Sequence, residues 1–313
     1  MDAEKTKEPG AEADSDGDDG IAVPKQSPFF RALNRARYHR QDLIGEIQRR
    51  TNRKLIAYVS EGSAIKPDDV VPLMDLLHET SVGTSIDFLL HTPGGDVDAA
   101  DKIVRILRRR VGSEGELRVV VPDFAKSAGT LIAIGADLIV MSDSSELGPI
   151  DPQIFVSDAS GHGAWRPAHT YVDGYNALVE IIDNPASYDA GKRTDAEQLL
   201  LSKYDPAMVD LCRQALKRSR ELAENLLKRG MLRDGAWTAV GAQLTDNTRW
   251  LSQHSAVIDS EDAQTMGLKV EYLSPTSWLW QAYWRLYCEQ RLAITTENPK
   301  LFESDYASLP FGP

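Results

Sequence analysis

Short apolar runs alternate with helical patterns along the chain between residues 50 and 155. The runs predict buried strands at Leu55–Val59, Ile86–Leu90, Leu117–Val121 and Leu138–Met141. The segments between them predict helices over Pro67–Glu79, over Val97–Val111 and up to Gly135. Strands that alternate with helices in this way predict an α/β fold, in which repeated right-handed βαβ units build a parallel sheet with flanking helices.

Beyond residue 156 the pattern becomes mainly helical. Residues 157–167 are rich in Gly, Ser and His, which is typical of a loop. Later elements are predicted as helices at 168–183 and 195–229, a β-like return at Ala256–Ile258, a short helix through Met266 and a final run at Leu268–Tyr272. We therefore predict one domain over 28–275, with a helical insertion at about 157–235.

The two ends of the chain differ in composition from this domain. Residues 1–20 hold eight acidic residues against Lys5 and Lys7, and so few apolar groups that we predict disorder over 1–27. Residues 276–313 form an aromatic C-terminal segment, with Trp278, Trp280, Tyr283 and Trp284 close together. Aromatic side chains concentrate at protein contacts, so 278–284 is a candidate docking site for a protein partner, and core packing of a terminal helix explains it equally well.

Composition and charge narrow the class of protein. The 313 residues carry a net charge of -12, which argues against nucleic acid as a partner because phosphate binding needs clustered cations. Cys212 and Cys288 lie in no paired motif, so we expect a reducing compartment and no structural zinc. We also expect no cofactor and no other metal. The sequence has no apolar signal segment and no run long enough to span a membrane, which favours a cytoplasmic, bacterial-type protein.

Two loops that follow predicted strands contain residues suited to acyl transfer. In His91-Thr92-Pro93-Gly94-Gly95-Asp96, adjacent glycines allow the backbone to approach a ligand and to direct an N–H at an oxyanion, although an ordinary turn also uses Pro-Gly-Gly. In Phe124-Ala125-Lys126-Ser127-Ala128-Gly129-Thr130, Ser127 stands between a strand and a helix, where a nucleophile elbow holds its serine. A helix N-cap is the other interpretation of Ser127.

A third loop, Leu147-Gly148-Pro149-Ile150-Asp151-Pro152, completes a recognisable series. HTPGGDVDAADKIVRIL, AKSAGTLIAIGADLIVM and LGPIDPQ, in this order and at this spacing, resemble the Clp protease, signal peptide peptidase and crotonase superfamily. More narrowly, they look like the serine dehydrogenase proteinase family of bacteria. The resemblance covers roughly residues 50–155 and resumes at 257–268. An Asp that caps its own turn also explains Asp151.

The resemblance implies a fold, an activity and several site residues. It implies a Clp protease/crotonase-like fold, Ser127 as the nucleophile, and an oxyanion hole made by the Gly94–Gly95 turn and the N–H of Ala128. It also implies an ATP-independent serine peptidase that acts on a protein or peptide and assembles as a homo-oligomer. A crotonase-type thioester enzyme and a catalytically inactive scaffold are the alternatives on the same fold.

The general base is not carried over by the resemblance, because Clp proteases place a His where this chain has Asp151. Lys126 adjoins Ser127, but neighbouring side chains generally diverge, so adjacency alone does not favour Lys126 as the base. An effect of its charge on the electrostatic field near the oxyanion explains the residue equally well. His169 lies at a suitable spacing and is otherwise expected to be a surface histidine. Our preferred hypothesis makes His254 the base and Asp151 the residue that orients it, since triads are defined by geometry and not by chain order.

Overall fold

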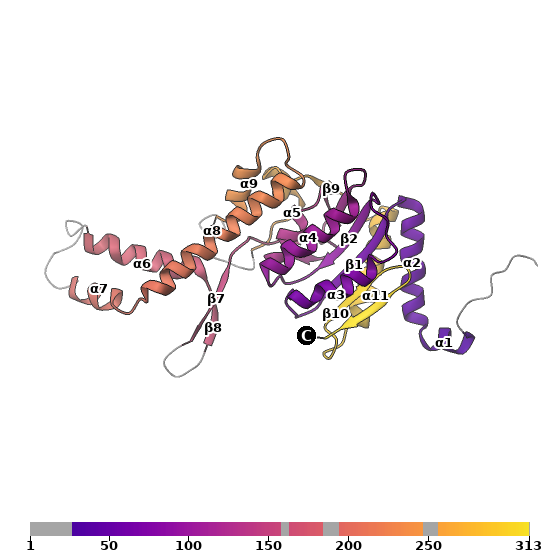
Figure 1. Cartoon of the computed structure of the whole chain (residues 1–313), viewed down its shortest axis with the longest axis horizontal. Coiled ribbons are helices and arrows are strands. Elements are labelled where there is room, and N and C mark those ends of the chain that lie inside the picture. The colour runs from indigo at the N-terminus through magenta and orange to yellow at the C-terminus, as the bar shows by residue number, and fades with distance from the viewer. Residues whose placement is uncertain (1–26, 158–162, 184–193, 247–255, 313) are drawn as a thin grey trace, which may run out of the picture.

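The centre of the molecule is a seven-stranded, mostly parallel sheet with the strand order β11-β10-β1-β2-β3-β5-β9 (Figure 1). The computed structural model describes residues 27–157, 163–183, 194–246 and 256–312. The parallel strands are β1 (Lys54–Ser60), β2 (Ile86–His91), β3 (Leu117–Val120), β5 (Leu138–Met141) and β9 (Val270–Tyr272). At one edge β10 (Lys300–Glu303) and β11 (Ser308–Phe311) add two antiparallel strands. This architecture confirms the predicted α/β class with a mainly parallel sheet.

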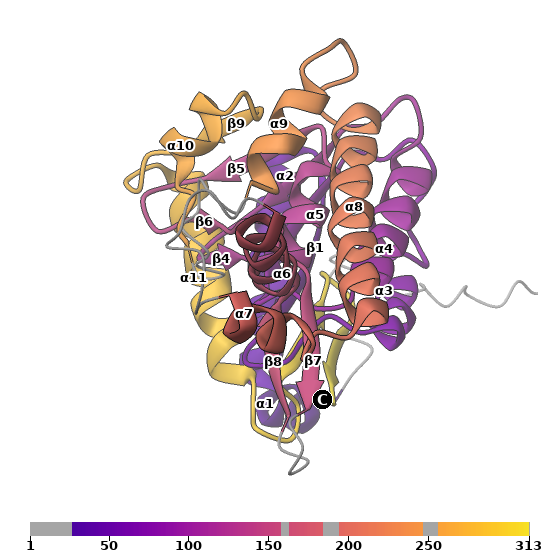
Figure 2. The same ribbon diagram turned by 90° about the vertical axis from the view of Figure 1, so that its left-hand side faces the viewer.

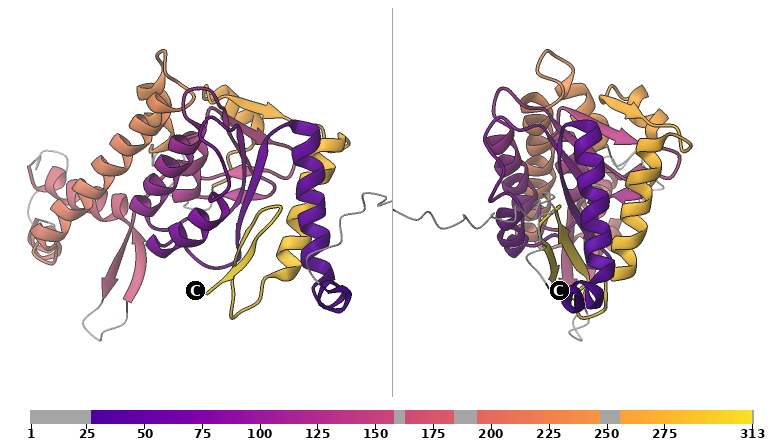
Figure 3. Two further views of the ribbon diagram at one scale, coloured as in Figure 1. Left: turned by 45° about the vertical axis from the view of Figure 1, so that its right-hand side comes forward. Right: turned by 90° about the vertical axis from the view of Figure 1, so that its right-hand side faces the viewer.

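Helices cover both faces of the sheet, which explains why its strands are continuous apolar runs. One face packs against α3 (Val70–Leu76), α4 (Val97–Val111), α5 (Ala128–Ile134) and part of α8 (Pro206–Arg229). The other face packs against α2 (Arg35–Thr51) and α11 (Trp278–Ala293), which lie side by side in Figure 3. In β1 the side chains alternate between these layers, with Ile56 and Tyr58 in the first core and Leu55, Ala57 and Val59 in the second.

The predicted elements of the central sheet agree with the structure to within a few residues. The strand at Leu138–Met141 and the helix at Val97–Val111 have the predicted bounds. The expected helix at Pro67–Glu79 is shorter: it starts as a 3-10 turn at Pro67–Asp69 and continues as α3 only to Leu76. The basic segment before β1 forms α1 (Pro28–Leu33) and α2.

The prediction of a loop over 157–167 was wrong for Ser157 and for Gly163–Pro167, which belong to two paired strands, and residues 158–162 lie outside the described ranges. Strands β7 (Gln153–Ser157) and β8 (Gly163–Pro167) pair antiparallel, and Phe155 stands opposite Trp165. Both aromatic side chains are more than half exposed, and β7 turns only Ile154 and Val156 toward the small core at its other face, so the apolar residues of this strand do not separate into a clear alternating pattern. Their rings make an edge-on contact, with centroids 5.5 Å apart.

The β7–β8 pair leads into a helical arm that projects from the body of the molecule (Figures 1 and 2). Its helices are α6 (Ala168–Asp183), α7 (Thr194–Leu201) and α8, and α9 (Trp237–Leu244) packs on α8. The predicted helix at 195–229 is interrupted between α7 and α8, where Asp205 caps α8 and Pro206 occupies its first turn. Ile154, Ala168, Val172 and Cys212 make a small core at the base of the arm.

The aromatic C-terminal segment is built into the domain. Trp280 and Tyr283 are buried between α11 and the sheet, and β10 and β11 extend the sheet. Trp278 is 40% exposed and lies under the guanidinium of Arg50. Core packing therefore accounts for Trp280 and Tyr283, and a partner docked at 278–284 stays a prediction. None of the helices in the described ranges has both the length and the apolar character needed to cross a membrane.

A fully buried ion pair joins the edge of the sheet to the segment after β1. The ammonium of Lys300 on β10 lies 2.7 and 2.9 Å from the two carboxylate oxygens of Asp69, and the hydroxyl of Tyr58 donates to the same carboxylate at 2.7 Å. Lys300 and Asp69 have no exposed surface. The Asp69 carboxylate also accepts a hydrogen bond from the Lys66 backbone N–H at 2.9 Å, so the Lys300 ammonium and these two hydrogen bonds together stabilise the buried charge.

We expect Lys300→Met to destabilise the protein strongly, because it leaves the Asp69 carboxylate buried without its counter-charge. The loss in unfolding free energy should be about 3–5 kcal/mol in urea denaturation followed by tryptophan fluorescence. Arg285→Gln is the control, since Arg285 is exposed and pairs with Glu289 one turn along α11. That change should cost less than about 1 kcal/mol. Equal effects of the two substitutions would contradict the assigned role of the buried pair.

Candidate active site

The three loops singled out in the sequence lie next to one another at the carboxyl ends of the parallel strands. Thr92, after β2, forms a parallel bridge with Ala125 in β4 (Phe124–Ala125). Strand β4 pairs in turn with β6 (Glu146–Leu147), so the loop after β6 lies alongside the other two. Ligands of parallel α/β sheets bind at this edge, where the helix N-termini present free N–H groups.

The Gly94–Gly95 turn is wedged between the segment after β1 and the Ser127 junction. Its φ angles of +104° and +146° lie in the region that favours glycine. A Cβ on Gly94 would lie 2.7 Å from the Lys126 carbonyl oxygen and 3.0 Å from the Ser127 Cβ. A Cβ on Gly95 would lie 2.4 Å from the backbone nitrogen of Ile65. The turn thus brings its backbone against the serine, as the oxyanion-loop interpretation requires.

Ser127 has a strained backbone at the junction between β4 and α5. Its φ of 50° and ψ of -109° differ from the extended conformation of an ordinary N-cap, and its side chain makes no capping hydrogen bond. Among the described residues, Asn52 is the only other non-glycine with positive φ, and it ends α2 in a left-handed turn. Strain of this kind persists where the surrounding structure imposes it, often at functional sites. The geometry favours a nucleophile elbow over the helix-cap interpretation.

Two backbone N–H groups near Ser127 are available to a ligand. No hydrogen bond to another described residue uses the N–H of Gly95 or of Ala128, the first residue of α5. The N–H of Gly94 is directed to the Thr92 hydroxyl oxygen at 3.2 Å. Because the Ala128 amide lies at a helix N-terminus, the helix dipole also favours negative charge there. Ala128 and Gly95 are therefore suitable donors to a developing oxyanion.

Lys126 is held away from a catalytic role by its partners. Its ammonium donates to a Glu146 carboxylate oxygen at 2.8 Å and to the carbonyl oxygens of Leu147 at 3.1 Å and Ala256 at 3.2 Å. These contacts account for all three ammonium hydrogens. Lys126 thus fastens the Ser127 junction to β6 and to the segment before α10 (Ser260–Thr265), and this arrangement argues against Lys126 as the general base.

Asp151 and His169 form a buried pair. The Nδ1 of His169 lies 3.1 Å from a carboxylate oxygen of Asp151, whose other oxygen accepts a hydrogen bond from the Gln153 side chain at 2.9 Å. His169 is 2% exposed, and its Nε2 is buried without a hydrogen-bond partner in the described part of the chain. The expectation of a surface histidine was therefore wrong. A carboxylate on Nδ1 and an unoccupied Nε2 are what a catalytic histidine needs.

The sequence contained a signal for this pair. His169 and Val172 lie three residues apart on α6, so helical spacing places them on one face of the helix. The apolar Val172 marks that face as one that packs inward. The β7–β8 pair then brings the start of α6 back to Asp151, and the Ala168 N–H donates to the Pro152 carbonyl at 2.9 Å. His254, the preferred base in the sequence analysis, lies outside the described residues, so its role stays a prediction.

The loop that carries Asp151 packs against the Ser127 junction. A Cβ on Gly148 would touch the Lys126 side chain at 2.7 Å and the Lys126 Cα at 3.4 Å, so the third loop packs on the residue before Ser127. Asp151 is three positions after Gly148, a link that spans at most about 11 Å when fully extended. The Thr130 hydroxyl lies 2.8 Å from the Gly148 carbonyl oxygen, which ties α5 to the same loop.

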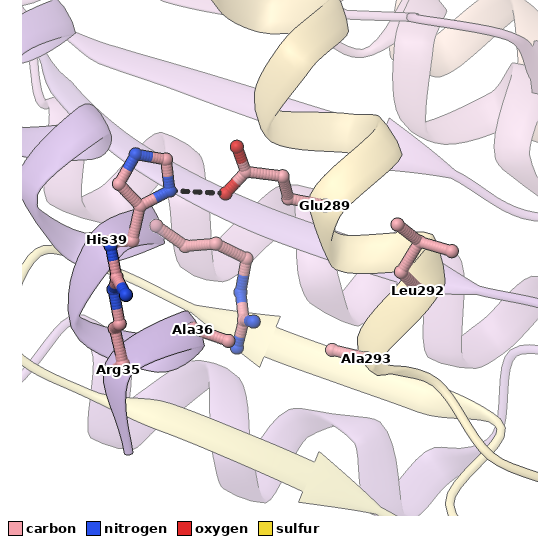
Figure 4. Close-up of a pocket in the computed structure, with 7 residues that line it drawn as sticks. Arg35, Ala36, His39, Glu289, Leu292 and Ala293 are labelled. Atoms are coloured by element: carbon pink, nitrogen blue, oxygen red, sulfur yellow. Dashed lines mark hydrogen bonds and ion pairs between the residues drawn. The ribbon is translucent and has the colours of Figure 1, made fainter. Parts of the chain in front are cut away.

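Two of the cavities in the described part of the molecule differ in their position relative to these loops. One, of about 520 Å³, lies between α2 and α11, where His39 pairs with Glu289 beside Leu292 (Figure 4). This cavity belongs to the helical layer that does not contain Ser127. The other, of about 650 Å³, is bordered by Ile150 and Pro152, the neighbours of Asp151, and by residues of α6, α8 and α9. It lies beside the Asp151–His169 pair.

Comparison with known proteins agrees with this geometry. Residues 30–162 match the model of the family described as ClpP-like SDH-type serine proteinase. Over this segment the chain is similar to that family. The match confirms the predicted family and includes both Gly94–Gly95 and Ser127, whereas His169 lies beyond its end.

The curated relatives that match the chain are themselves uncharacterised. One protein of Methanocaldococcus jannaschii is 31% identical over 186 residues, which are 59% of this chain and 53% of that protein. A second protein of the same organism is 27% identical over 216 residues, which are 66% of this chain and 62% of that protein. The chain thus spans about half to three-fifths of the length of these relatives.

We expect Gly95→Ala to disrupt the turn that precedes α4. The added methyl group would collide with the Ile65 backbone at a φ that disfavours any side chain, so unfolding free energy should fall by roughly 2 kcal/mol or more. Gly62→Ala is the matched control, because Gly62 also has positive φ but has open space around its Cα. It should lose only about 1 kcal/mol, the conformational part of the effect. Urea denaturation of both variants tests this difference, and similar losses would mean that the close approach to Ile65 is unimportant.

Proposed function

We propose that this protein is a serine peptidase in which Ser127 forms an acyl-enzyme and the Gly94–Gly95 turn with Ala128 forms the oxyanion hole. The observation that carries the proposal is the strained Ser127 backbone packed against Gly94. The similarity of residues 30–162 to a family of ClpP-like serine proteinases supports the same reaction class. The substrate is a protein or peptide.

The Asp151–His169 pair supplies the base in this proposal, in place of His254. His169 Nε2 removes the proton from the Ser127 hydroxyl as its oxygen attacks the substrate carbonyl, and later gives that proton to the leaving amine. Asp151 holds the Nδ1 hydrogen and stabilises the imidazolium. Water then hydrolyses the acyl-enzyme by the reverse proton path. The pairing of His169 with Asp151 and its unoccupied Nε2 support this assignment.

The two backbone amides act where negative charge develops. When the substrate carbonyl becomes tetrahedral, the N–H groups of Gly95 and Ala128 donate to its oxygen. A preorganised donor of this type is worth about a hundredfold to a thousandfold in rate. Lys126 has a structural function in this mechanism: its ion pair with Glu146 holds the junction in place. The family resemblance also supports a cytoplasmic, ATP-independent enzyme that works as a homo-oligomer.

Labelling with a fluorescent fluorophosphonate tests the nucleophile directly. The wild-type protein should be labelled once per chain, and Ser127→Ala should abolish labelling. Intact-protein mass and a peptide map that locates the adduct at Ser127 provide the measurement. If the wild-type protein is not labelled, or if Ser127→Ala is still labelled, the proposed peptidase function is wrong, and an inactive scaffold or a thioester enzyme becomes the better interpretation.

A set of histidine variants tests the base. His169→Ala should lower the labelling rate by about a thousandfold, and Asp151→Asn by about a hundredfold or more, because both remove activation of the serine. His39→Ala is the matched control: His39 is also paired with a carboxylate, Glu289 at 2.8 Å, but lies in the α2–α11 layer. His254→Ala decides between the two proposed bases. Unchanged labelling in His169→Ala together with a large loss in His254→Ala would overturn the assignment to His169.

A further inference from the structure

A cluster of buried and half-buried polar and aromatic side chains lies next to the candidate active site, on the α11 side of the sheet. We call it the His91 cluster, and it comprises His91, Asp123, Phe124 and Tyr287. His91 is the last residue of β2 and has no exposed surface. None of these side chains has a part in the proposed reaction. The reason why they lie next to the Gly94–Gly95 turn and Ser127 is therefore a separate question.

The aromatic contacts of the cluster join two backbone segments that carry the candidate catalytic groups. The His91 ring packs against the Phe124 ring at a tilt of 52°, with centroids 4.1 Å apart, and against the Tyr287 ring at the same tilt, with centroids 4.9 Å apart. The residue after His91 is hydrogen-bonded to the same strand: Thr92 N–H donates to the Phe124 carbonyl at 3.0 Å, and Lys126 N–H donates to the Thr92 carbonyl at 3.1 Å. The cluster thus clamps the strand pair that continues into the Gly94–Gly95 turn and into Ser127.

The hydrogen bonds of the cluster have a consistent direction. The Tyr287 hydroxyl donates to an Asp123 carboxylate oxygen at 2.5 Å and lies 3.3 Å from His91 Nδ1. A hydrogen on Nδ1 can therefore be directed at the Tyr287 oxygen, which leaves the neutral imidazole between two rings. Through Tyr287, helix α11 is attached to the loop after β3 and to the end of β2.

We propose that His91, held between Phe124 and Tyr287, is a positioning residue that sets the spacing between the Gly94–Gly95 turn and Ser127. The proposal rests on the proposed function, because that spacing determines where the Gly95 and Ala128 amides meet the substrate oxygen. A displacement of about 1 Å in such a group is enough to lower a rate by about a hundredfold. The His91 cluster acts through the turn and touches no reacting atom.

Substitutions on one helix separate positioning from general stability. Tyr287→Phe removes the hydroxyl at the active-site end of α11. Tyr283→Phe removes a buried hydroxyl one turn earlier, where it donates to Asp87 at 2.6 Å near the opposite end of β2. Both variants lose one hydrogen bond from the same helix to a carboxylate. Only Tyr287→Phe is expected to slow fluorophosphonate labelling of Ser127, by about threefold to tenfold.

Substitutions of His91 test the ring itself. His91→Ala should lower the maximal labelling rate by about tenfold to a hundredfold and leave the concentration of half-maximal labelling within about threefold. His91→Phe keeps an aromatic ring against Phe124 and should recover most of the rate. Wild-type labelling in His91→Ala, or equal slowing in Tyr283→Phe and Tyr287→Phe, would overturn the positioning role.

Amide hydrogen exchange keeps this test independent of activity. In His91→Ala the Asp96 and Lys126 amides, which donate to Ile65 and Thr92, should exchange at least about tenfold faster than in the wild type, and in Tyr283→Phe they should not. If the wild-type protein is never labelled at Ser127 but this exchange pattern is found, the proposed peptidase function fails and the structural coupling stands. Unchanged exchange in His91→Ala would reject the coupling.

The pH dependence of the unfolding free energy also reports on the burial of His91 in the cluster. Burial lowers the pKa of His91 from its usual 6.5 to about 4, the Glu61 carboxylate opposes this shift, and Arg291 on α11 adds to it. Asp123 and Tyr287 are the other titratable groups that face the ring. His91 of the unfolded chain is therefore protonated near pH 6.5, whereas His91 of the folded protein is protonated only near pH 4. The folded state accordingly loses stability as the pH falls between these two values.

We expect His91→Phe to remove this acid sensitivity. Between pH 7.5 and pH 5 the unfolding equilibrium constant of the wild type should rise roughly thirtyfold more than that of the variant, measured by urea denaturation at both pH values. His78→Phe is the control, because that histidine is exposed, and its pH profile should follow the wild type. Equal acid sensitivity in wild type and His91→Phe would show that His91 is not locked into the cluster as a neutral ring.

Discussion

The close approach of the Gly94 backbone to Ser127 is the constraint on which the candidate site depends. A side chain at position 94 would collide with the Lys126 carbonyl and the Ser127 Cβ, so two chain segments from neighbouring strands meet there without any space between them. The contact also holds Ser127 at a backbone conformation that costs about 1–3 kcal/mol. Such strain survives only because the residues on both sides are fixed by other interactions.

Those interactions come from three directions. Every residue of α5 is buried, and the helix begins at Ala128, so the backbone after Ser127 has little freedom to relax. The Lys126 ammonium fixes the residue before Ser127 through Glu146 and two carbonyl groups. The absence of a side chain at Gly129, where a Cβ would lie 2.6 Å from the Thr92 side chain, lets α5 pack directly on the strand that leads to the turn. Rigidity of this kind is what a preorganised oxyanion hole requires.

The parts of the molecule that the sequence predicted well are those with strong local patterns. The strand at Leu138–Met141 and the helix at Val97–Val111 are covered on both sides, so burial and sequence periodicity coincide. The pairing of β7 with β8 was missed because Phe155 and Trp165 are exposed and contribute no burial pattern. The antiparallel addition of β10 next to β1 was missed as well, because it joins residues about 240 positions apart through a buried Lys300 that no local pattern marks as core.

The position of His169 shows why the base was the hardest part of the site to predict. Asp151 and His169 are 18 residues apart, and the intervening residues resemble an exposed loop. Within this stretch β7 pairs with β8 and returns the chain to Pro152, so a peripheral element brings the imidazole to the carboxylate.

The same helix that carries His169 also begins the projecting arm, and Val172 packs with Ile154 and Cys212 at the base of that arm. The orientation of the imidazole therefore depends on how α6 is seated on α8, whereas Ser127 and the Gly94–Gly95 turn depend on the sheet. In this fold the core beside the sheet holds the nucleophile, whereas the small core at the base of the arm holds the proposed base. The loop from Gly148 to Pro152 is the short connection between the two.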